Sequence, residues 1–273
     1  MVLKQYKQSL LFYTLSIIIP WALWFLAAYL SHTTNEVFIN LSSTIGFAGL
    51  LAPFIVSLFL ILPSKELKQD FIGRFFNLKT VKLYYIIIAC TLMLVSILLA
   101  QAISLVFGYS LEQFQITGSY TFTSGVFPVW FLLIIAPVIE ELAWHSYGTD
   151  CLRTRFNLFN TSVLFALFWG VWHIPLSFIK DYYQSNLVES GLLYSLNFIV
   201  SLFPFVIIMN WLYYKTNRNI LIPIIFHITA GYFNEIFATH PMSKVIQTVL
   251  LLLLSAYLLL NNKEFFFNSK TTI

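Results

Sequence analysis

Charged residues are scarce in this sequence. Asp, Glu, Lys and Arg make up only 10% of its 273 residues, whereas 59% of them are hydrophobic. A soluble domain carries roughly 25% charged residues, so the composition excludes an ordinary soluble protein and predicts a polytopic membrane protein. The net charge of +4 does not indicate a nucleic-acid partner, because the basic residues are distributed as membrane topology requires.

Cysteine is scarce as well. The two cysteines, Cys90 and Cys151, are not placed like a disulfide, and the CxxC spacing of a structural zinc site does not occur. No repeat, low-complexity tract or soluble segment interrupts the chain, so residues 1–273 are predicted to form a single membrane domain. The first apolar run is too long for a signal peptide and is expected to be retained. A prokaryotic plasma membrane is the expected location, because no targeting extension is recognisable.

Long apolar runs are abundant. Each run can cross roughly 30 Å of hydrocarbon at a rise of about 1.5 Å per residue. The sequence therefore predicts an all-α fold of eight transmembrane helices, of which the seventh is the shortest. The predicted spans are residues 9–30, 41–63, 83–108, 126–148, 158–179, 191–214, 220–237 and 244–261.

Basic residues alternate between the connecting loops. All but two of the 15 Lys and Arg lie before the first span, in the second, fourth and sixth loops, or after the last span. The positive-inside rule therefore predicts that both termini are cytoplasmic, and membrane lipids are the first expected partner. The second loop, residues 65–79, either lies along the inner membrane surface or is an ordinary basic loop. The basic residues on the predicted cytoplasmic side are Lys4, Lys7, Lys65, Lys68, Arg74, Lys79, Lys82, Arg153, Arg155, Lys215, Arg218, Lys263 and Lys270.

Two adjacent carboxylates, Glu140 and Glu141, follow an apolar run in the predicted fourth span. A carboxylate at membrane depth costs several kcal/mol unless it is paired, protonated or facing water, so such residues indicate function. His145 lies one helical turn after Glu141 and can hold that carboxylate charged. The alternative is a buried pair that only fixes helix packing. The functional hypothesis places Glu140 on the order of 13 Å deep, in a site that opens towards the cytoplasmic half of the bilayer.

Two histidines lie in later spans, His173 in the fifth and His227 in the seventh. A lone intramembrane histidine is more often a packing residue, but two histidines together with two glutamates favour a site. Counting residues along the helices places His227 level with Glu140 and His173 deeper. Residues 126–237, helices four to seven, are therefore the predicted catalytic core. Further candidates on the same helix faces are Trp169, Gly231 and Asn234.

Glutamate and histidine together fit two mechanisms for hydrolysis of an amide inside the bilayer. In the first, Glu140 deprotonates a water molecule, and a histidine polarises that water or the substrate carbonyl. In the second, the histidines and a glutamate bind Zn²⁺, which lowers the pKa of the water. The HExxH pattern of common zinc proteases is missing, and zinc stays possible. No other cofactor is indicated.

The motifs E-E-x-x-x-R, F/W-x-x-x-H and H-x-x-x-N on three membrane helices characterise the CAAX protease and bacteriocin-processing family of intramembrane proteases. This sequence resembles that family through Glu140-Glu141, Trp169 to His173, and His227. The resemblance implies that Glu140 and His173 activate water. It also implies that His227 and the family's asparagine stabilise the oxyanion, and that Glu141 supports the site. The implied substrate is a protein or peptide with a membrane-associated, prenylated C-terminus, from which family members remove the last three residues.

Two positions depart from the family pattern. His145 stands where the family has arginine, and Gly231 stands where it has asparagine; Asn234, further along a similar face, is a candidate substitute. Loss of one oxyanion donor typically costs about 10²- to 10³-fold in rate. The chain is therefore expected to be a slow or rearranged protease, or else a non-catalytic relative that acts as a membrane binding or bacteriocin-immunity protein. A proton-coupled transporter is a third alternative, which the lack of an internal repeat disfavours.

Overall fold

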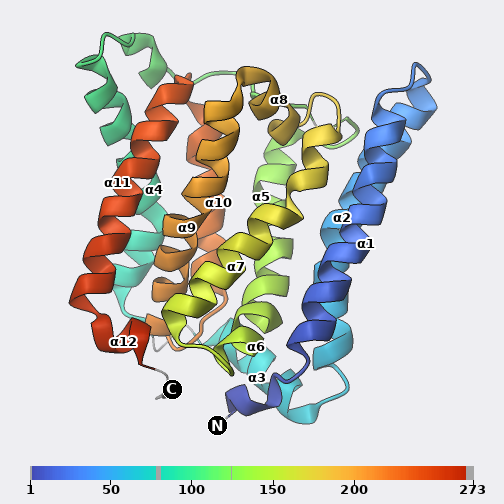
Figure 1. The fold of residues 1–273 in the computed structure, drawn as a ribbon, viewed down its shortest axis with the longest axis vertical. Helices are drawn as coiled ribbons and strands as arrows, with labels where there is room; N and C mark the ends of the chain where they lie inside the picture. The colour runs from blue at the N-terminus through green and yellow to red at the C-terminus, as the bar shows by residue number, and fades with distance from the viewer. Residues whose placement is uncertain (1, 78–80, 124, 269–273) are drawn as a thin grey trace.

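The computed structural model describes residues 2–77, 81–123 and 125–268, and the predicted basic residues Lys79 and Lys270 lie outside them. In this part of the chain the fold is all-helical (Figure 1). The helices are α1 (Ser9–Ser31), α2 (Glu36–Ile61), α3 (Lys65–Phe76), α4 (Leu83–Leu105), α5 (Val129–Ala143), α6 (Thr149–Arg153), α7 (Leu158–Trp172), α8 (Tyr183–Ser190), α9 (Leu192–Lys215), α10 (Leu221–Ile236), α11 (Pro241–Asn261) and α12 (Lys263–Phe267). Single turns of other helix types are η1 (Val2–Gln5), η3 (Leu111–Phe114), η4 (Trp144–Gly148) and η5 (Ile174–Phe178).

Seven of the described helical segments are long and apolar enough to cross a membrane, which confirms a multi-pass, all-α membrane protein. Two of them are composite, because Val129–Arg153 joins α5, η4 and α6, and Leu158–Phe178 joins α7 and η5. The predicted seventh span corresponds to α10, which has only 16 residues. At about 1.5 Å per residue its length is about 24 Å, short of the roughly 30 Å of a hydrocarbon core.

Local capping explains where predicted and observed helix starts differ. The predicted second span begins at residue 41, but α2 begins at Glu36, because the side chain of Asn35 accepts a hydrogen bond from the Val37 N–H at 2.9 Å. The second predicted loop contains α3, whose first turn is capped by the Ser64 hydroxyl, 3.2 Å from the Leu67 N–H. The loop therefore has regular structure, which the sequence had left open.

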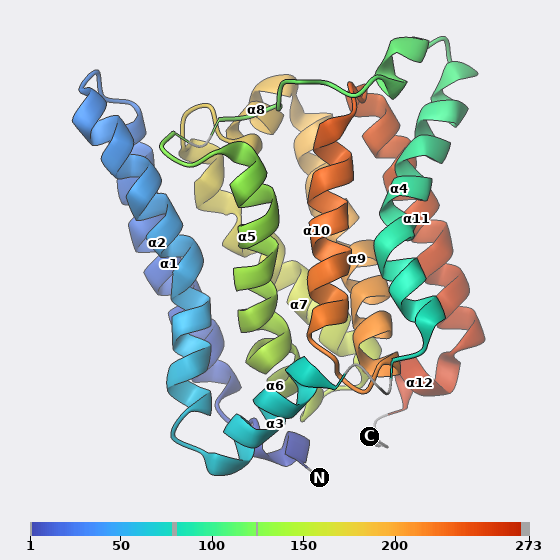
Figure 2. The same ribbon diagram turned by 180° about the vertical axis from the view of Figure 1, so that it is seen from behind.

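The helices divide into a hairpin and a bundle. In Figures 1 and 2 the α1–α2 hairpin stands at one side of the molecule, and α3 crosses one end of it. The hairpin packs on α5 through α2, while α5, α10, α4, α11, α9 and α7 contact one another in sequence around the bundle. We call the end that carries η1, α3, α6 and α12 the terminal end, and the end that carries α8 the far end.

Polar side chains face the interior, and large apolar side chains cover the outer surface. Leu10, Phe59 and Leu253 are among the exposed apolar residues on the outer helices. Their exposure suits contact with lipid hydrocarbon, since water is absent from that region. Many buried polar groups find hydrogen-bond partners on neighbouring helices, as Gln247 does on Ser96 and Asn210 on Ser162.

Candidate active site

The site begins where α5 changes its helical pitch. Immediately after the two glutamates the chain forms η4, a π-helix, before α6 resumes the α-helical pitch. A π turn leaves carbonyl groups without their usual partners and is frequent at functional sites. Here the Arg74 guanidinium donates to the His145 and Ser146 carbonyls at 3.0 and 2.9 Å. The predicted span over residues 126–148 therefore contains a π turn, and Arg74 of α3 supplies donors to its carbonyl groups.

Glu140 is held by two indole groups. Its Oε2 accepts hydrogen bonds from Nε1 of Trp169 at 2.9 Å and from Nε1 of Trp144 at 3.3 Å. The residue is 8% exposed and lines a cavity inside the bundle. One carboxylate oxygen is thus fixed by α5 and α7, which orients the group toward the cavity.

Glu141 faces away from that cavity and is fully buried. Its Oε2 pairs with Nδ1 of His145, as the sequence predicted, and its Oε1 accepts from Nδ1 of His227 at 2.7 Å. Both oxygens are occupied by imidazoles. Glu141 therefore ties α5 to α10 and fixes the ring orientation of His227.

His145 is fully buried and has a polar partner on each ring nitrogen. Its Nδ1 pairs with Oε2 of Glu141, and its Nε2 lies 3.0 Å from Oδ1 of Asn210. Asn210 is held in turn by Ser162, because its Nδ2 donates to the Ser162 hydroxyl at 2.9 Å. An imidazole that connects Glu141 to α9 therefore stands where the family motif has arginine.

His173 ends α7 and lines the same cavity as Glu140. Its Nδ1 lies 2.7 Å from the Trp169 carbonyl oxygen. A carbonyl only accepts, so Nδ1 carries the proton, and Nε2 of the neutral ring is an acceptor. Although residue counting placed His173 deeper than Glu140, both side chains line one cavity. Figure 1 shows that α7 crosses the bundle obliquely.

One cavity of about 270 Å³ collects most of the predicted site residues. Its lining includes Glu140, Trp169, His173, His227, Gly231 and Asn234, whereas Glu141 and His145 lie behind it. A Cβ atom at Gly231 would lie 3.7 Å from Leu133 Cδ2, an ordinary contact distance, so the position has room for a side chain. Asn234 donates from Nδ2 to the Ala230 carbonyl at 3.0 Å. Its carboxamide nitrogen is thus already engaged within α10.

The cavity extends from the site toward the far end of the molecule. Its lining there includes Tyr183 of α8, Glu235 at the end of α10 and Lys244 at the start of α11. On the other side, α3 and the segment from η4 to α6 lie between the site and the terminal end (Figure 2). The tertiary packing of α3, not recognisable from the sequence, covers the site on the side of the termini. The opening towards the cytoplasmic half of the bilayer depends on which end is cytoplasmic and stays a prediction.

A second cavity, of about 230 Å³, meets the first at Glu140 and His173. It lies between the α1–α2 hairpin and α5, and Tyr182 and Gln184 line both cavities. Burial, and then the nearby charge of Glu140, raise the pKa of Tyr182 to about 12. Its hydroxyl therefore keeps its proton at neutral pH and is a hydrogen-bond donor beside the site.

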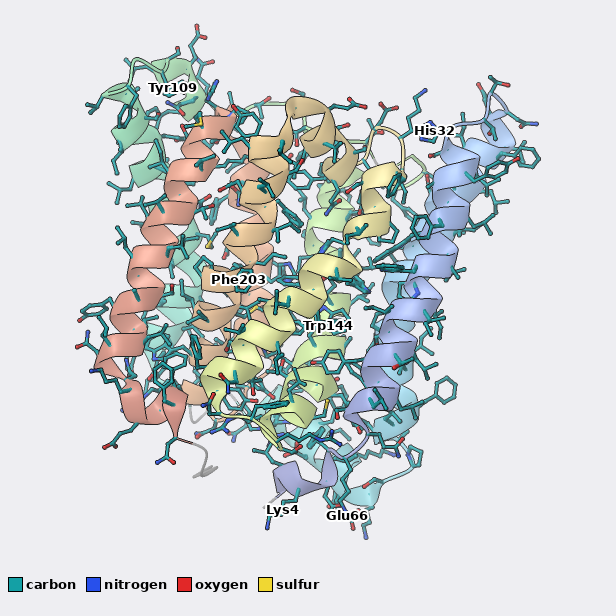
Figure 3. The ribbon with its side chains drawn as sticks, viewed as in Figure 1. Lys4, His32, Glu66, Tyr109, Trp144 and Phe203 are labelled. Atoms are coloured by element: carbon teal, nitrogen blue, oxygen red, sulfur yellow. The ribbon has the colours of Figure 1, made fainter. Side chains whose placement is uncertain are left out.

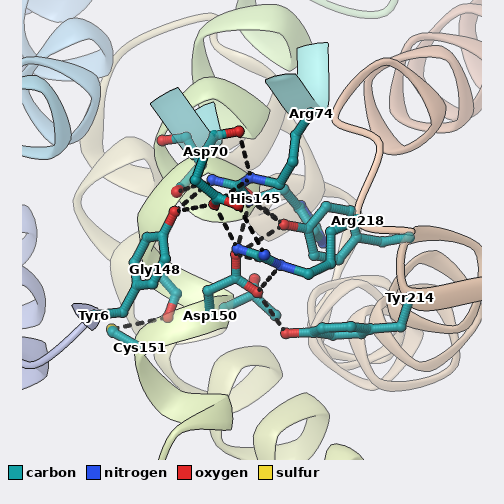
Figure 4. A network of polar contacts seen from close by, with 12 residues as sticks. Tyr6, Asp70, Arg74, His145, Gly148, Asp150, Cys151, Tyr214 and Arg218 are labelled. Atoms are coloured by element: carbon teal, nitrogen blue, oxygen red, sulfur yellow. Dashed lines mark hydrogen bonds and ion pairs between the residues drawn. The ribbon is translucent and has the colours of Figure 1, made fainter. Parts of the chain in front are cut away.

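Sequence reasoning missed a buried ionic cluster below the glutamates, shown in Figure 4. It consists of two acids and two arginines, Asp70, Arg74, Asp150 and Arg218, and we call it the ionic cluster. Asp150 Oδ2 lies 2.7 Å from Nη1 of Arg74 and 2.6 Å from Nη2 of Arg218, and Asp70 Oδ2 lies 2.9 Å from Nη2 of Arg218. Hydroxyl groups that complete it come from Tyr6, Tyr213 and Tyr214.

The ionic cluster binds four segments together, namely α3, α6, the end of α9 and the turn before α10. The sequence assigned Arg74 and Arg218 to solvent-facing basic loops, but 5% and 7% of these residues are exposed. The spacing of Asp70 and Arg74, one helical turn apart, was the available signal. Asp150, an acid at the end of an apolar run, was a second.

The zinc hypothesis finds no suitable ligand set. Within the described residues no group of three or more His, Cys, Asp or Glu is placed to hold a metal ion. Both oxygens of Glu141 are bonded to imidazole nitrogens, and Nδ1 of His173 is bonded to a carbonyl. We therefore derive no catalytic step through a metal.

A multi-pass helical protein that holds a carboxylate and two imidazoles against one internal cavity has the architecture of an intramembrane hydrolase. Residues 121–233 match the Rce1-like family, described as Type II CAAX prenyl endopeptidase Rce1-like. Over 253 residues the chain is 40% identical to CAAX prenyl protease 2 of the archaeon Methanococcus maripaludis, a match that covers 92% of this chain and 93% of that protein. The chain therefore belongs to the Rce1-like CAAX prenyl endopeptidase family and is an intramembrane endopeptidase similar to the CAAX proteases.

Proposed function

We propose that this protein hydrolyses a peptide bond in the C-terminal CAAX segment of a membrane-associated protein, with Glu140 as general base. The observation that carries this proposal is the shared cavity of Glu140 and His173. In each side chain one polar atom is fixed by the helices, namely Oε2 of Glu140 and Nδ1 of His173. The remaining atoms, Oε1 and Nε2, are acceptors for the two hydrogens of one water molecule.

The hydrolytic step follows from these positions. Oε1 of Glu140 takes a proton from the water while the water oxygen bonds to the scissile carbonyl carbon. Nε2 of His173 accepts the second hydrogen and fixes the direction of attack. As the tetrahedral intermediate collapses, the C–N bond breaks and Glu140 returns its proton to the leaving amine. Glu140 and His173 are thus the proposed catalytic residues, with Trp169 and Trp144 as positioning residues.

In the tetrahedral intermediate the negative charge lies on the former carbonyl oxygen of the substrate. His227 is the proposed hydrogen-bond donor to this oxygen. Glu141 fixes Nδ1 of His227, which leaves Nε2 for the cavity. In its protonated form Nε2 of His227 is the proposed donor to this oxygen. Glu141, which is held by His145 and holds His227, acts on the reaction through His227.

The substrate class comes from the family. A CAAX segment is a C-terminal signal whose cysteine is prenylated, so the proposed partners are membrane lipids and a protein with a prenylated C-terminus. The proposed cut lies after that cysteine and releases the last three residues. Residues 126–237 form the proposed catalytic core of the membrane domain.

Replacing Gly231 with asparagine is expected to accelerate cleavage of a farnesylated CAAX peptide by up to about 10²-fold, because it adds a donor next to His227. The position accommodates a side chain, since its Cβ would meet only Leu133 at ordinary distance. Single-turnover cleavage by purified parent and variant in detergent measures the gain. Gly231→Ala is the matched control, which adds volume without a donor and is expected to give no gain.

The same assay tests the proposed function. Cleavage by the parent supports hydrolysis, and a gain limited to Gly231→Asn shows that the missing donor sets the rate. Failure of both proteins to cut CAAX peptides would overturn the proposal and favour a binding or immunity role, for which the absence of an oxyanion donor at Gly231 is the favouring observation.

We also propose that all eight apolar helices, α10 included, cross a prokaryotic plasma membrane with both termini cytoplasmic. Figure 3 labels Lys4 and Glu66 at one end of the molecule and His32 and Tyr109 at the other. Apart from Lys180 and Lys244, the described basic residues outside the ionic cluster gather at the first of these ends, which supports a cytoplasmic position for it. In this orientation the cavity extends from the catalytic residues into the outer half of the bilayer.

Cysteine labelling in intact cells tests this orientation. In a Cys90→Ala background, Thr34→Cys is expected to react with a membrane-impermeant maleimide, whereas Lys4→Cys is expected to react only after permeabilisation. Both positions are exposed and lie at opposite ends of the molecule. The reverse pattern would place the cavity toward the cytoplasm and would show that the ionic cluster, rather than loop charge, governs insertion.

A further inference from the structure

The far end of the larger cavity carries a cation. Among the described residues that line this cavity, Lys244 is the one Lys or Arg. Its Nζ lies 3.4 Å from Oε1 of Glu235 and 5.7 Å from the centroid of the Tyr183 ring. Glu235 is already engaged, because its Oε2 accepts from the backbone N–H and hydroxyl of Thr121 at 3.1 and 2.7 Å. An ammonium group has three donors, and this long contact with Glu235 occupies one of them.

The surroundings of Lys244 suit an anionic ligand. The residue lies in the first turn of α11, a helix of 21 residues, where the helix dipole adds positive potential. Only 17% of the Lys244 side chain is exposed, so a bound anion is partly shielded from water and the pair is stronger than at a surface. The rest of the wall there includes Leu251 and Leu187, which suits apolar neighbours of the anion.

A second polar group in the lining of this cavity is unpaired. Oε1 of Gln184 is buried and has no hydrogen-bond partner among the described residues, and Gln184 lines the cavity. Only 9% of the residue is exposed. An unpaired buried acceptor is costly unless a ligand satisfies it, and the backbone N–H of an extended peptide is a suitable donor.

The spacing along α10 matches a short peptide. Glu235, which contacts Lys244, lies eight residues after His227, a rise of about 12 Å along the helix. Three extended residues span about 10–11 Å from the carbonyl at which the chain is cut to the terminal carboxylate. A tripeptide therefore reaches from the proposed oxyanion donor to the cation.

We propose that Lys244 binds the free C-terminal carboxylate of the substrate and that Gln184 accepts a hydrogen bond from the backbone of its last three residues. This subsite rests on the proposed function and adds the reason why the cut falls three residues from the end. Because Lys244 holds the terminal carboxylate, the distance from Lys244 to the catalytic residues sets the position of the cut. Lys244 and Gln184 contact substrate away from the reacting atoms and determine specificity.

Two peptide pairs test the subsite in the full-length protein in detergent. The first pair is a farnesylated CAAX peptide with a free carboxylate and the same peptide with a C-terminal amide. The parent is expected to prefer the carboxylate by about 10- to 100-fold in kcat/KM, mainly through KM, as for other hydrogen bonds to charged groups. Lys244→Met is expected to abolish the preference, and Lys244→Arg to retain most of it. Lys180→Met is the matched control, because Lys180 is an exposed lysine at the same end that lines the second cavity.

The second pair is the released tripeptide Val-Ile-Met and its amide, whose binding is measured by calorimetry and needs no cleavage. Stronger binding of the carboxylate to the parent, lost in Lys244→Met, supports the subsite even if cleavage fails. Because Lys244→Met leaves Glu235 without its cation, Lys244→Met/Glu235→Gln is measured as well and is expected to show the same loss. Equal affinity of the parent for carboxylate and amide, or a preference that survives in both variants, would overturn the proposal.

Discussion

Glu140→Gln is expected to lower kcat for CAAX-peptide cleavage by about 10²- to 10⁴-fold, the usual contribution of a general base. A carboxamide cannot take a proton from water at neutral pH. The carboxamide oxygen can still accept hydrogen bonds from Trp169 and Trp144. In the parent protein these two indole N–H groups donate to Oε2 of Glu140 at 2.9 and 3.3 Å. Substrate binding and thermal stability in detergent should therefore change little. Initial rates, KM and the thermal midpoint of parent and variant separate these effects.

The matched control is Glu36→Gln, which removes an equal charge from an exposed position in the first turn of α2. It is expected to keep the parental rate. Unchanged cleavage by Glu140→Gln would refute its role as base, and would also exclude the proton-relay alternative that the sequence left open. A variant that loses both activity and fold would not match the expectation, because the indole contacts are retained.

Asp150→Ala is expected to destabilise the protein by about 3–5 kcal/mol, since it leaves buried arginines without their shared counter-ion. The Asp150 carboxylate is fully buried and contacts Arg74, Arg218 and the hydroxyls of Tyr213 and Tyr214. With Asp150 removed, two guanidinium groups share the single remaining acid of the ionic cluster, Asp70. Thermal unfolding in detergent, followed by tryptophan fluorescence, measures the loss.

Two further variants make this expectation specific. Glu66→Ala removes an exposed acid, which accepts a hydrogen bond from the Ser64 hydroxyl at 3.0 Å, and is expected to cost about 0.5 kcal/mol or less. Asp150→Ala/Arg218→Met restores the balance of one acid and one arginine and is expected to be more stable than Asp150→Ala alone. A single Asp150→Ala variant as stable as the parent would show that the ionic cluster contributes no net stability.

The ionic cluster also connects stability with catalysis. Arg74 contributes to the ionic cluster and donates to the carbonyls of His145 and Ser146 in the π turn. That turn directly follows the two glutamates. Loss of the ionic cluster is therefore expected to move Glu140 as well as to destabilise the fold, which distinguishes it from a remote ion pair.

Much of the fold could be predicted from the amino-acid composition and from the lengths of the apolar runs. Lipid replaces water around the outer helices, so a span satisfies its backbone hydrogen bonds within a long apolar helical segment, and this constraint makes spans recognisable in the sequence. The lengths of α1, α4 and α9 follow directly. The length of α10 does not follow from apolar run length in this way. The helix begins after Ile220 and ends after 16 residues, where Phe237 has an extended backbone conformation. Its ends are set by contacts with other segments, such as the N–H of Ile220 donating to the Arg74 carbonyl at 3.4 Å.

The candidate site was readable because intramembrane acids and histidines are rare and costly. Glu140, His173 and His227 stand out by residue type alone, and the structure places all three on one cavity. The different surroundings of Glu140 and Glu141 could not be predicted from the sequence. Adjacent positions on a helix point in different directions, so Glu140 meets the cavity and indoles while Glu141 meets two imidazoles.

The sequence by itself determined the class of fold, the helices that carry the chemistry and the residue types available for it, because hydrophobicity and helical periodicity are local properties. Only the tertiary structure decided the direction of the cavity, the second partner of His145 and the pairing of Arg74 with a π turn. Each of these depends on groups distant in the chain, such as Asn210 for His145 and α3 for the turn. Hydrogen bonds between buried polar groups are satisfied by spatial neighbours, and spacing along the chain does not reveal which neighbours those are.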